Sequence, residues 1–150
     1  MLRTGEHYLE SLRDGRIVYV GKERVDDVTA HPAFANAGTM FAMMYDLKCA
    51  PEMRDTLTFV DGGERHSAYF LKPRDRAELE LRTKAHRAIA AFSHGLLGRS
   101  PDHVASSITG LAMGAEVFDR DGADYAKNIE AYQRHARDND LFVTYAILPP

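Results

Sequence analysis

Four long stretches of the sequence repeat apolar residues at the spacing of an α-helix, and this pattern limits the possible folds more than any other feature. The stretches cover residues 29–47, 73–98, 100–118 and 125–136. Apolar residues three and four positions apart form a stripe that a helix buries against a neighbour. The predicted stripes consist of Phe34, Ala37, Phe41 and Met44; Leu81, Ala85, Ala88, Phe92 and Leu96; Val104, Ile108, Leu111, Ala115 and Phe118; and Tyr125, Ile129, Tyr132 and Ala136. The chain is therefore predicted to be mainly α.

Residues that commonly start or stop helices lie near the ends of these stretches. Thr4 is the predicted N-cap of a further, short helix, and Gly15 is predicted to end it. Pro32 suits the first turn of the first long helix. Gly98 is the predicted terminator of the second long helix.

Two short segments are predicted to be β-hairpins, and a third is predicted to be a strand. Residues 16–25 and 56–71 are rich in β-branched and aromatic residues. Each contains a glycine turn, Gly21–Lys22 in the first and Asp61–Gly62–Gly63 in the second. Residues 140–150 form a nearly continuous apolar run that predicts a strand ending at two prolines. The predicted fold is mainly α, with four to five helices, two small β-hairpins and a C-terminal strand.

Composition and charge fit one globular domain over residues 1–150 and exclude several classes of partner. Hydrophobic residues make up 45% of the chain and charged residues 27%, as in soluble proteins. The net charge is −3 and basic residues alternate with acidic ones, so nucleic-acid binding is not expected. Cys49 is the single cysteine, and no histidine pair has metal-ligand spacing, so no metal site is expected. Without a signal core or a membrane span, the sequence indicates a cytoplasmic protein.

An arginine directly before a predicted helix start is the most informative local feature. The segment reads LLGRSPDHV, in which Ser100 is a predicted cap, Pro101 suits the first helical position and Asp102 complements the helix dipole. A helix N-terminus already carries partial positive charge, so Arg99 adds charge of the same sign. Arg99 and the first N–H groups of the helix therefore predict an anion site. The alternative is that Arg99 pairs with Asp102 or with a nearby backbone carbonyl.

Two further side chains are candidates for the same pocket. His103 lies at the beginning of the same predicted helix, close enough to share a pocket with Arg99. Tyr145 is an aromatic residue with a polar tip inside the apolar C-terminal run. The simpler interpretations are an exposed surface histidine and a core tyrosine whose hydroxyl finds a partner.

Four motifs occur in a characteristic order along the chain. They read RTGEHYLESLRDGRIVYVGKERVDDVTAHPAF, YFLKPRDRAELELR, GLLGRSPDH and NDLFVTYAILPP. The most specific parts are the opening RTGEHYLESLRDGR, the segment DVTAHPAF and the GRSPD motif. In this order they resemble the N-terminal region of the flavin-dependent 4-hydroxyphenylacetate 3-monooxygenase family, the oxygenase component of a two-component system. The resemblance extends from Arg3 to Pro150, which is essentially the whole chain.

The resemblance implies a helical first domain in an acyl-CoA-dehydrogenase-like superfamily. Family members continue into a β-rich middle domain and a C-terminal helical domain that hold most of the flavin. This chain is then a first domain, a truncated piece or a degenerate relative. A separate flavin reductase supplies reduced FAD, and an oxygen atom is transferred to the carbon ortho to a phenol hydroxyl. Thr144 and Pro149 are the residues expected to contact the flavin, and a homo-oligomer is expected for the full-length protein.

The resemblance also assigns roles at the substrate site, with two departures from the family pattern. Arg99 of the GRSPD motif is implied to bind the phenol oxygen, with Ser100 beside it. The family motif commonly continues with tyrosine, where this chain has His103, and its strand motif commonly has histidine, where this chain has Tyr145. We hypothesise that the pocket is retained but rearranged, with Arg99, His103 and Tyr145 as catalytic residues. Because of this exchange, 4-hydroxyphenylacetate itself need not be the substrate.

Two functions other than a monooxygenase are alternative interpretations of this sequence. The 4-hydroxybutyryl-CoA dehydratase branch of the superfamily needs cysteines for an iron–sulfur cluster, and Cys49 lies far from the GRSPD motif, which disfavours it. A stand-alone helical module that binds a ligand or partner without catalysis is favoured by the chain length. The retained arginine motif favours the enzyme.

Overall fold

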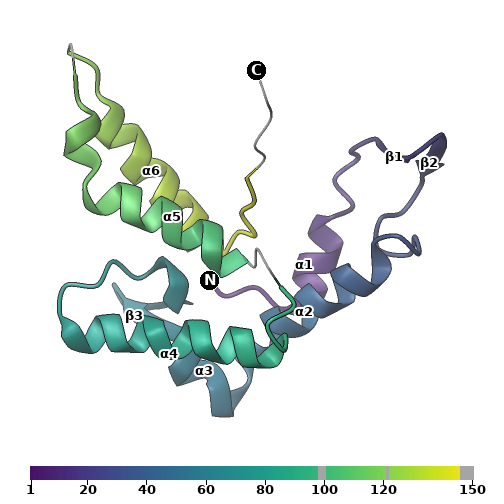
Figure 1. Ribbon diagram of the computed structural model, residues 1–150, viewed down its shortest axis with the longest axis horizontal. Coiled ribbons are helices and arrows are strands. Elements are labelled where there is room, and N and C mark those ends of the chain that lie inside the picture. The colour runs from purple at the N-terminus through teal and green to yellow at the C-terminus, as the bar shows by residue number, and fades with distance from the viewer. Residues whose placement is uncertain (98–100, 121, 146–150) are drawn as a thin grey trace. The chain divides into compact units, whose positions relative to one another are not determined.

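The computed structural model describes residues 1–97, 101–120 and 122–145, with the backbone alone at residue 101. These residues form six α-helices, two short 3-10 helices and two two-stranded antiparallel sheets, which confirms the mainly α prediction (Figure 1). The chain divides into two compact units, Arg3–Met53 and Met1–Leu2 with Arg54–Pro150, and each is described by itself.

The first unit contains two helices and one hairpin. Its elements are α1 (Gly5–Ser11), β1 (Val18–Val20), β2 (Glu23–Val25) and α2 (Ala35–Cys49). The Thr4 side chain accepts a hydrogen bond from the His7 backbone N–H, which confirms the predicted N-cap. The β1–β2 pairing places Val20 opposite Glu23, so Gly21 and Lys22 form the turn as predicted.

Close backbone packing joins α1 to α2. The backbone N–H of Gly5 donates to the Asp46 carboxylate at 2.7 Å, and the Tyr8 and Tyr45 rings stack with centroids 5.0 Å apart. A side chain at Gly5 would collide with the Ala42 carbonyl, so only glycine fits there. This explains why the opening motif carries a glycine directly after its capping threonine.

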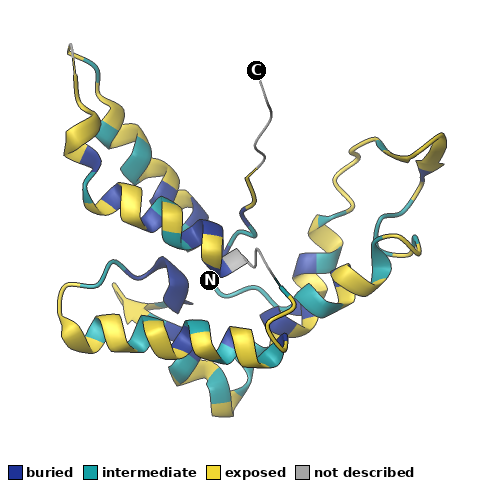
Figure 2. Ribbon diagram, in the orientation of Figure 1, coloured by how far each residue is buried: buried dark blue, intermediate teal, exposed yellow. Residues whose placement is uncertain are grey.

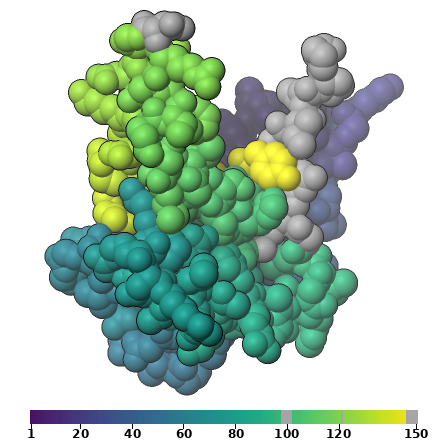
Figure 3. All heavy atoms as spheres, turned by 60° about the vertical axis from the view of Figure 1, so that its left-hand side comes forward, coloured from purple at the N-terminus to yellow at the C-terminus, as the bar shows by residue number. Residues whose placement is uncertain are grey.

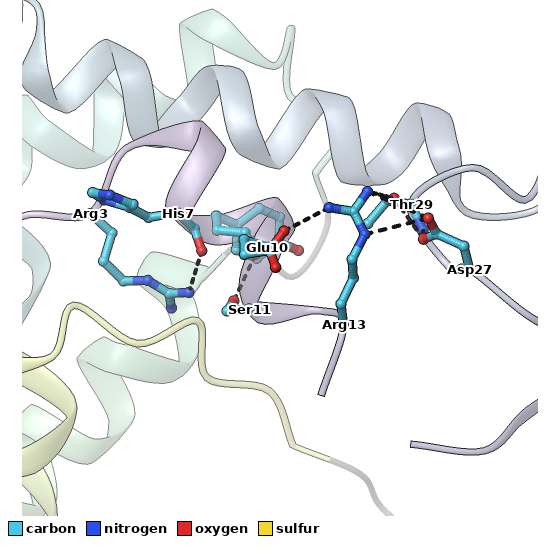
Figure 4. A network of polar contacts seen from close by, with 8 residues as sticks. Arg3, His7, Glu10, Ser11, Arg13, Asp27 and Thr29 are labelled. Carbon is cyan, nitrogen blue, oxygen red and sulfur yellow. Dashed lines mark hydrogen bonds and ion pairs between the residues drawn. The ribbon is translucent and has the colours of Figure 1, made fainter. Parts of the chain in front are cut away.

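An arginine of the opening motif connects α1 to the loop that follows β2 (Figure 4). The Arg13 guanidinium donates to Glu10 at 2.7 Å, to Thr29 at 3.0 Å and to Asp27 at 3.4 Å. Asp27 in turn accepts from the backbone N–H and the hydroxyl of Thr29, and these two bonds lower the pKa of its carboxyl. The motif residues therefore hold the base of the hairpin in place.

Several details of the first unit differ from the predictions. Helix α1 ends at Ser11, before Gly15, and Pro32 lies in a turn before α2 because the helix begins only at Ala35. The buried face of α2 is also shifted from the predicted stripe: Ala37 is exposed. The buried positions are Gly38, Ala42, Met44, Tyr45 and Lys48.

The second unit contains the remaining long helices and the second hairpin. Its elements are β3 (Thr58–Asp61), β4 (Glu64–Ser67), η1 (Ala68–Phe70), α4 (Arg76–Phe92), α5 (Pro101–Met113), η2 (Ala115–Phe118) and α6 (Tyr125–Asp138). The short helix α3 (Pro51–Leu57), which was not predicted, leads into it. The β3–β4 register leaves Gly62 and Gly63 as the turn, which confirms the second hairpin.

The core of the second unit is centred on η1 (Figure 2). Tyr69 and Phe70 are almost completely buried there, and α4 and α5 both contact this segment. Helices α5 and α6 run side by side in opposite directions (Figure 1). The Gln133 amide of α6 donates to the Phe70 carbonyl at 3.0 Å, so a buried polar side chain connects α6 to the core.

Helix α4 begins as its sequence indicates but ends early. The Asp75 carboxylate accepts from the Glu78 backbone N–H and caps the helix. The helix stops at Phe92, and the Gly95 N–H, with φ at 72°, bonds to the Ala90 carbonyl at 2.9 Å. Leu96 is consequently beyond the helix and 82% exposed, so its place in the predicted stripe is wrong. Gly98, the predicted terminator, lies outside the described residues.

The predicted stripes of α5 and α6 are correct in part. Val104, Ala115 and Ala136 are buried as predicted. Four predicted core residues are instead substantially exposed, namely Leu111, Phe118, Tyr125 and Tyr132. Thr109 and Gln133 are buried in spite of their polarity, because each side chain donates to a backbone carbonyl of η1.

The predicted C-terminal strand is not present in the part of it that the structure describes. Asp140 lies in a turn with φ at 46°, and residues 141–145 are neither helix nor strand and pair with neither two-stranded sheet. A strand forms only with a hydrogen-bonding partner beside it, and neither two-stranded sheet extends to this run. The rest of the predicted strand, residues 146–150, lies outside the described residues.

Candidate functional site

The first turn of α5 places two neighbouring side chains in different environments. Asp102 is 8% exposed, whereas His103 is exposed. Successive residues of an α-helix are turned by about 100° around its axis. The first turn therefore holds a carboxylate in the interior and presents an imidazole at the surface.

The structure brings together two of the residues predicted to line the pocket. The His103 and Tyr145 rings lie with centroids 5.9 Å apart and planes inclined by 40°. Tyr145 is 39% exposed, so its alternative interpretation as a core tyrosine does not hold, whereas His103 is exposed, as the simpler interpretation of that residue expects. Figure 3 shows the end of the described chain, in yellow, against α5, in green. The two residues are 42 positions apart in the sequence, so their contact is a tertiary one.

The other predicted site residues are only partly within the described part of the chain. Thr144 is exposed and directly precedes Tyr145. Arg99, Ser100 and Pro149 lie outside the described residues, so the proposed anion site remains a prediction. In the sequence, Arg99 is two residues before Pro101, the first residue of α5, and four residues before His103.

A polar network joins α4 to the first turns of α5. His86 Nδ1 lies 2.6 Å from a carboxylate oxygen of Asp102, and His86 Nε2 lies 3.3 Å from the Ser106 hydroxyl. The Arg82 guanidinium donates to the Ser106 hydroxyl at 2.8 Å and to the Leu71 carbonyl at 2.9 Å. Burial lowers the pKa of Arg82. We call Arg82, His86, Asp102 and Ser106 the α4–α5 network.

The α4–α5 network contains aspartate, histidine and serine but is not arranged for nucleophilic attack. Ser106 donates its proton to the Asp102 carbonyl oxygen at 2.7 Å, while Arg82 donates to the Ser106 oxygen. The Ser106 proton is thus directed to the backbone of its own helix, whereas activation of a serine requires that the histidine accept this proton. Sequence reasoning missed this network, although Arg82–His86 and Asp102–Ser106 both have the i,i+4 spacing that aligns side chains on one helix face.

The residues that could hold a flavin are few within the described chain. Thr144 offers an exposed hydroxyl and Tyr145 an exposed aromatic ring, which are groups that fit the edge and face of an isoalloxazine. Among residues 1–97, 101–120 and 122–145 there is no group of three histidine, cysteine, aspartate or glutamate side chains that could bind a metal. None of the helices in the described chain is long and apolar enough to cross a membrane.

Sequence comparisons identify relatives along the full length of the chain. The 4-hydroxyphenylacetate 3-monooxygenase oxygenase component of Thermus thermophilus is 36% identical over 152 residues, which cover 100% of this chain and 31% of the relative. The pyoverdin chromophore biosynthetic protein PvcC of Pseudomonas aeruginosa is 43% identical, with 99% of this chain and 29% of the relative covered. The chain thus spans about a third of the length of these relatives.

Solved structures agree with the sequence comparisons. The oxygenase component (HpaB) of 4-hydroxyphenylacetate 3-monooxygenase superposes with a TM-score of 0.91 at 34% identity, covering 99% of this chain and 31% of that one. The same component complexed with FAD and 4-hydroxyphenylacetate gives a TM-score of 0.87 at 34% identity, covering 93% of this chain and 29% of that chain. An archaeal 4-hydroxybutyryl-CoA dehydratase from N. maritimus, at 22% identity and a TM-score of 0.73, shares the fold.

The family assignment follows from the extent of these matches. Residues 4–150 match the family described as "4-hydroxyphenylacetate 3-hydroxylase N terminal", which confirms the resemblance inferred from the motif order. The chain belongs to the 4-hydroxyphenylacetate 3-hydroxylase family and corresponds to its N-terminal region.

Proposed function

We propose that this chain supplies part of the phenol-binding wall of a two-component monooxygenase that uses reduced FAD to hydroxylate a phenol ortho to its hydroxyl. The observation that carries the proposal is the contact of His103, in the first turn of α5, with Tyr145; His103 follows Arg99 by four residues in the sequence. The relatives named 4-hydroxyphenylacetate 3-monooxygenase and 4-nitrophenol 2-monooxygenase support a phenolic substrate.

The chemistry of phenols explains why these residue types suit such a wall. A phenol becomes a better carbon nucleophile as its hydroxyl approaches phenolate, and positive charge near the oxygen favours that form. Arg99 stays charged at all relevant pH values and can donate hydrogen bonds from its guanidinium to the phenol oxygen. His103 can exchange a proton with that oxygen. Tyr145 offers a ring face against which an aromatic substrate packs.

Reduced FAD, when bound, would activate molecular oxygen: one oxygen atom is transferred to the phenol, the other leaves as water, and the flavin is oxidised. In this proposal the Thr144 hydroxyl contacts the edge of the flavin. Pro149, in the same closing motif of the sequence, is the second proposed flavin contact. Most of the flavin is held by domains of the family outside residues 1–150. The proposed partner is a flavin reductase that supplies the reduced FAD. The full-length protein is proposed to be a homo-oligomer located in the cytoplasm.

An oxygenation assay tests this proposal. The protein encoded by the complete reading frame is supplied with reduced FAD, ¹⁸O₂ and a panel of phenols: phenol, 4-nitrophenol and 4-hydroxyphenylacetate. The expected product is a catechol that carries one ¹⁸O atom. Absence of labelled catechol from every phenol, with binding of reduced FAD established separately, contradicts the proposal.

The proton-transfer role of His103 has its own test. Replacement by phenylalanine, His103→Phe, keeps an aromatic ring beside Tyr145 but removes the titrating nitrogen. We expect the pH profile of kcat to change when this nitrogen is removed. An unchanged pH profile counts against proton transfer by His103 while leaving substrate binding by Arg99 intact.

A further inference from the structure

We propose that His86 is a positioning residue for the substrate wall: it holds Asp102 and thereby fixes the rotation of the first turn of α5, so that His103 faces Tyr145. The role assigned to His86 in substrate binding rests on the proposed function. The contacts that position His103 involve no ligand. It concerns a residue on α4, a helix that carries none of the predicted site residues.

His86 donates a hydrogen bond to the Asp102 carboxylate. A carboxylate only accepts hydrogen bonds, so His86 Nδ1 carries the hydrogen and donates it at 2.6 Å. The Asp102 side chain is 11% exposed and the His86 side chain is 32% exposed. Because this contact is partly shielded from water, it is stronger than an ion pair at the open surface.

Arg82 connects α4 both to the core and to α5. Arg82 lies one turn before His86 and donates to the Leu71 carbonyl, directly after η1. The same guanidinium donates to Ser106, one turn after Asp102. Two successive turns of α4 therefore hold two successive turns of α5, and four bonded side chains determine how α5 is rotated about its axis.

The position of Asp102 determines the direction of the His103 side chain. His103 directly follows Asp102, so the angle between their side chains is set by the helix itself. When Asp102 is held toward α4, His103 can point only to the exposed side, where its ring lies 5.9 Å from that of Tyr145. Loss of the His86 bond removes this restraint from the first turn of α5, where a helix has the fewest intrahelical hydrogen bonds.

Substitutions at His86 separate positioning from simple stabilisation. In His86→Asn the side-chain amide reaches the place of Nδ1 and can still donate to Asp102. In His86→Gln it reaches the place of Nε2 and loses that bond. His86→Phe fills the ring volume without a donor and repeats the test if the glutamine variant fails to fold. The matched control is His135→Ala, since His135 is exposed and bonds to Asn139 within α6.

The readout is the set of NOE cross-peaks between the His103 and Tyr145 ring protons in the isotopically labelled chain, with thermal unfolding measured in parallel. We expect the cross-peaks to persist in His86→Asn and His135→Ala and to be lost in His86→Gln and His86→Phe. Retention of the cross-peaks in the glutamine and phenylalanine variants, or their loss in the asparagine variant, overturns the proposal. The measurement uses no phenol or flavin, so its failure is distinguishable from failure of the proposed function.

Discussion

Replacing Gly5 by alanine tests the packing of α1 on α2 most sharply. A methyl carbon at this position would lie 2.5 Å from the Ala42 carbonyl oxygen and 2.6 Å from a carboxylate oxygen of Asp46. Even a tight contact of 3.0 Å requires the backbones to separate by 0.5 Å, the difference between 3.0 and 2.5 Å. That separation also lengthens the 2.7 Å bond from the Gly5 N–H to Asp46.

The expected cost follows from these two effects. Overpacking of this kind destabilises by about 1–3 kcal/mol, and a hydrogen bond to a charged group contributes about 1.5–3 kcal/mol. The higher helix propensity of alanine offsets about 1 kcal/mol. We therefore expect Gly5→Ala to lower the free energy of unfolding by about 1.5–5 kcal/mol.

Urea unfolding followed by far-UV circular dichroism, together with hydrogen exchange of α2 amides, measures this change. Gly110 provides the control, because it lies within α5 and an added methyl group there meets open space. Gly110→Ala is expected to stabilise the chain by about 0.5–1 kcal/mol through helix propensity. If Gly5→Ala is as stable as Gly110→Ala, the proposed packing of α1 on α2 is wrong.

Three further substitutions have distinct expected outcomes. Hydrogen bonds from Arg16 lower the pKa of Asp14 to about 2, so the stability from this contact is present above the usual carboxyl pKa of 3.8 and is lost as the pH falls toward 2. Arg16→Gln should raise the pKa of Asp14 toward 3.8 in an NMR titration, and an unchanged value refutes the assigned cause. Gln133→Ala leaves the buried Phe70 carbonyl without its donor and opens a cavity, so a loss of about 2–4 kcal/mol is expected in urea unfolding, and a loss below about 1 kcal/mol contradicts this. Glu130→Ala breaks only an exposed i,i+4 ion pair and should change stability by less than about 0.5 kcal/mol in the same assay.

Local chemistry allowed the boundaries of several elements to be predicted from the sequence. Thr4 caps α1 because its hydroxyl reaches a backbone N–H three residues ahead, which depends on nothing outside that turn. Both hairpins were predicted for the same reason, since their glycine turns and β-branched flanks act within a few residues. Helix α3 was missed because it has only seven residues and begins at a proline, Pro51, a residue that suits the first helical position but also commonly interrupts helices.

The buried faces of the helices could not be predicted with the same success, because they depend on distant partners. Lys48 is fully buried with its ammonium 3.9 Å from the centroid of the Tyr45 ring, an arrangement that no apolar stripe indicates. Gln133 is buried because the Phe70 carbonyl, 63 residues away, accepts its hydrogen bond. Tyr132, one position before it, is therefore turned outward.

The candidate site was predictable only where a motif marked it. Arg99 and His103 were selected by the GRSPD motif, and Tyr145 by its place in the closing motif. The α4–α5 network was missed, because His86 and Asp102 are 16 residues apart and become neighbours only when two helices pack.

The affinity for a phenol tests the central claim most directly. Binding of 4-nitrophenol to the protein from the complete reading frame is measured by isothermal titration calorimetry, with nitrobenzene as the analogue that lacks the hydroxyl. The account predicts that Arg99→Ala abolishes the preference for the phenol over nitrobenzene, whereas His135→Ala leaves it unchanged. Equal phenol affinity in the wild-type protein and in Arg99→Ala would contradict the claim that this region binds the phenol oxygen.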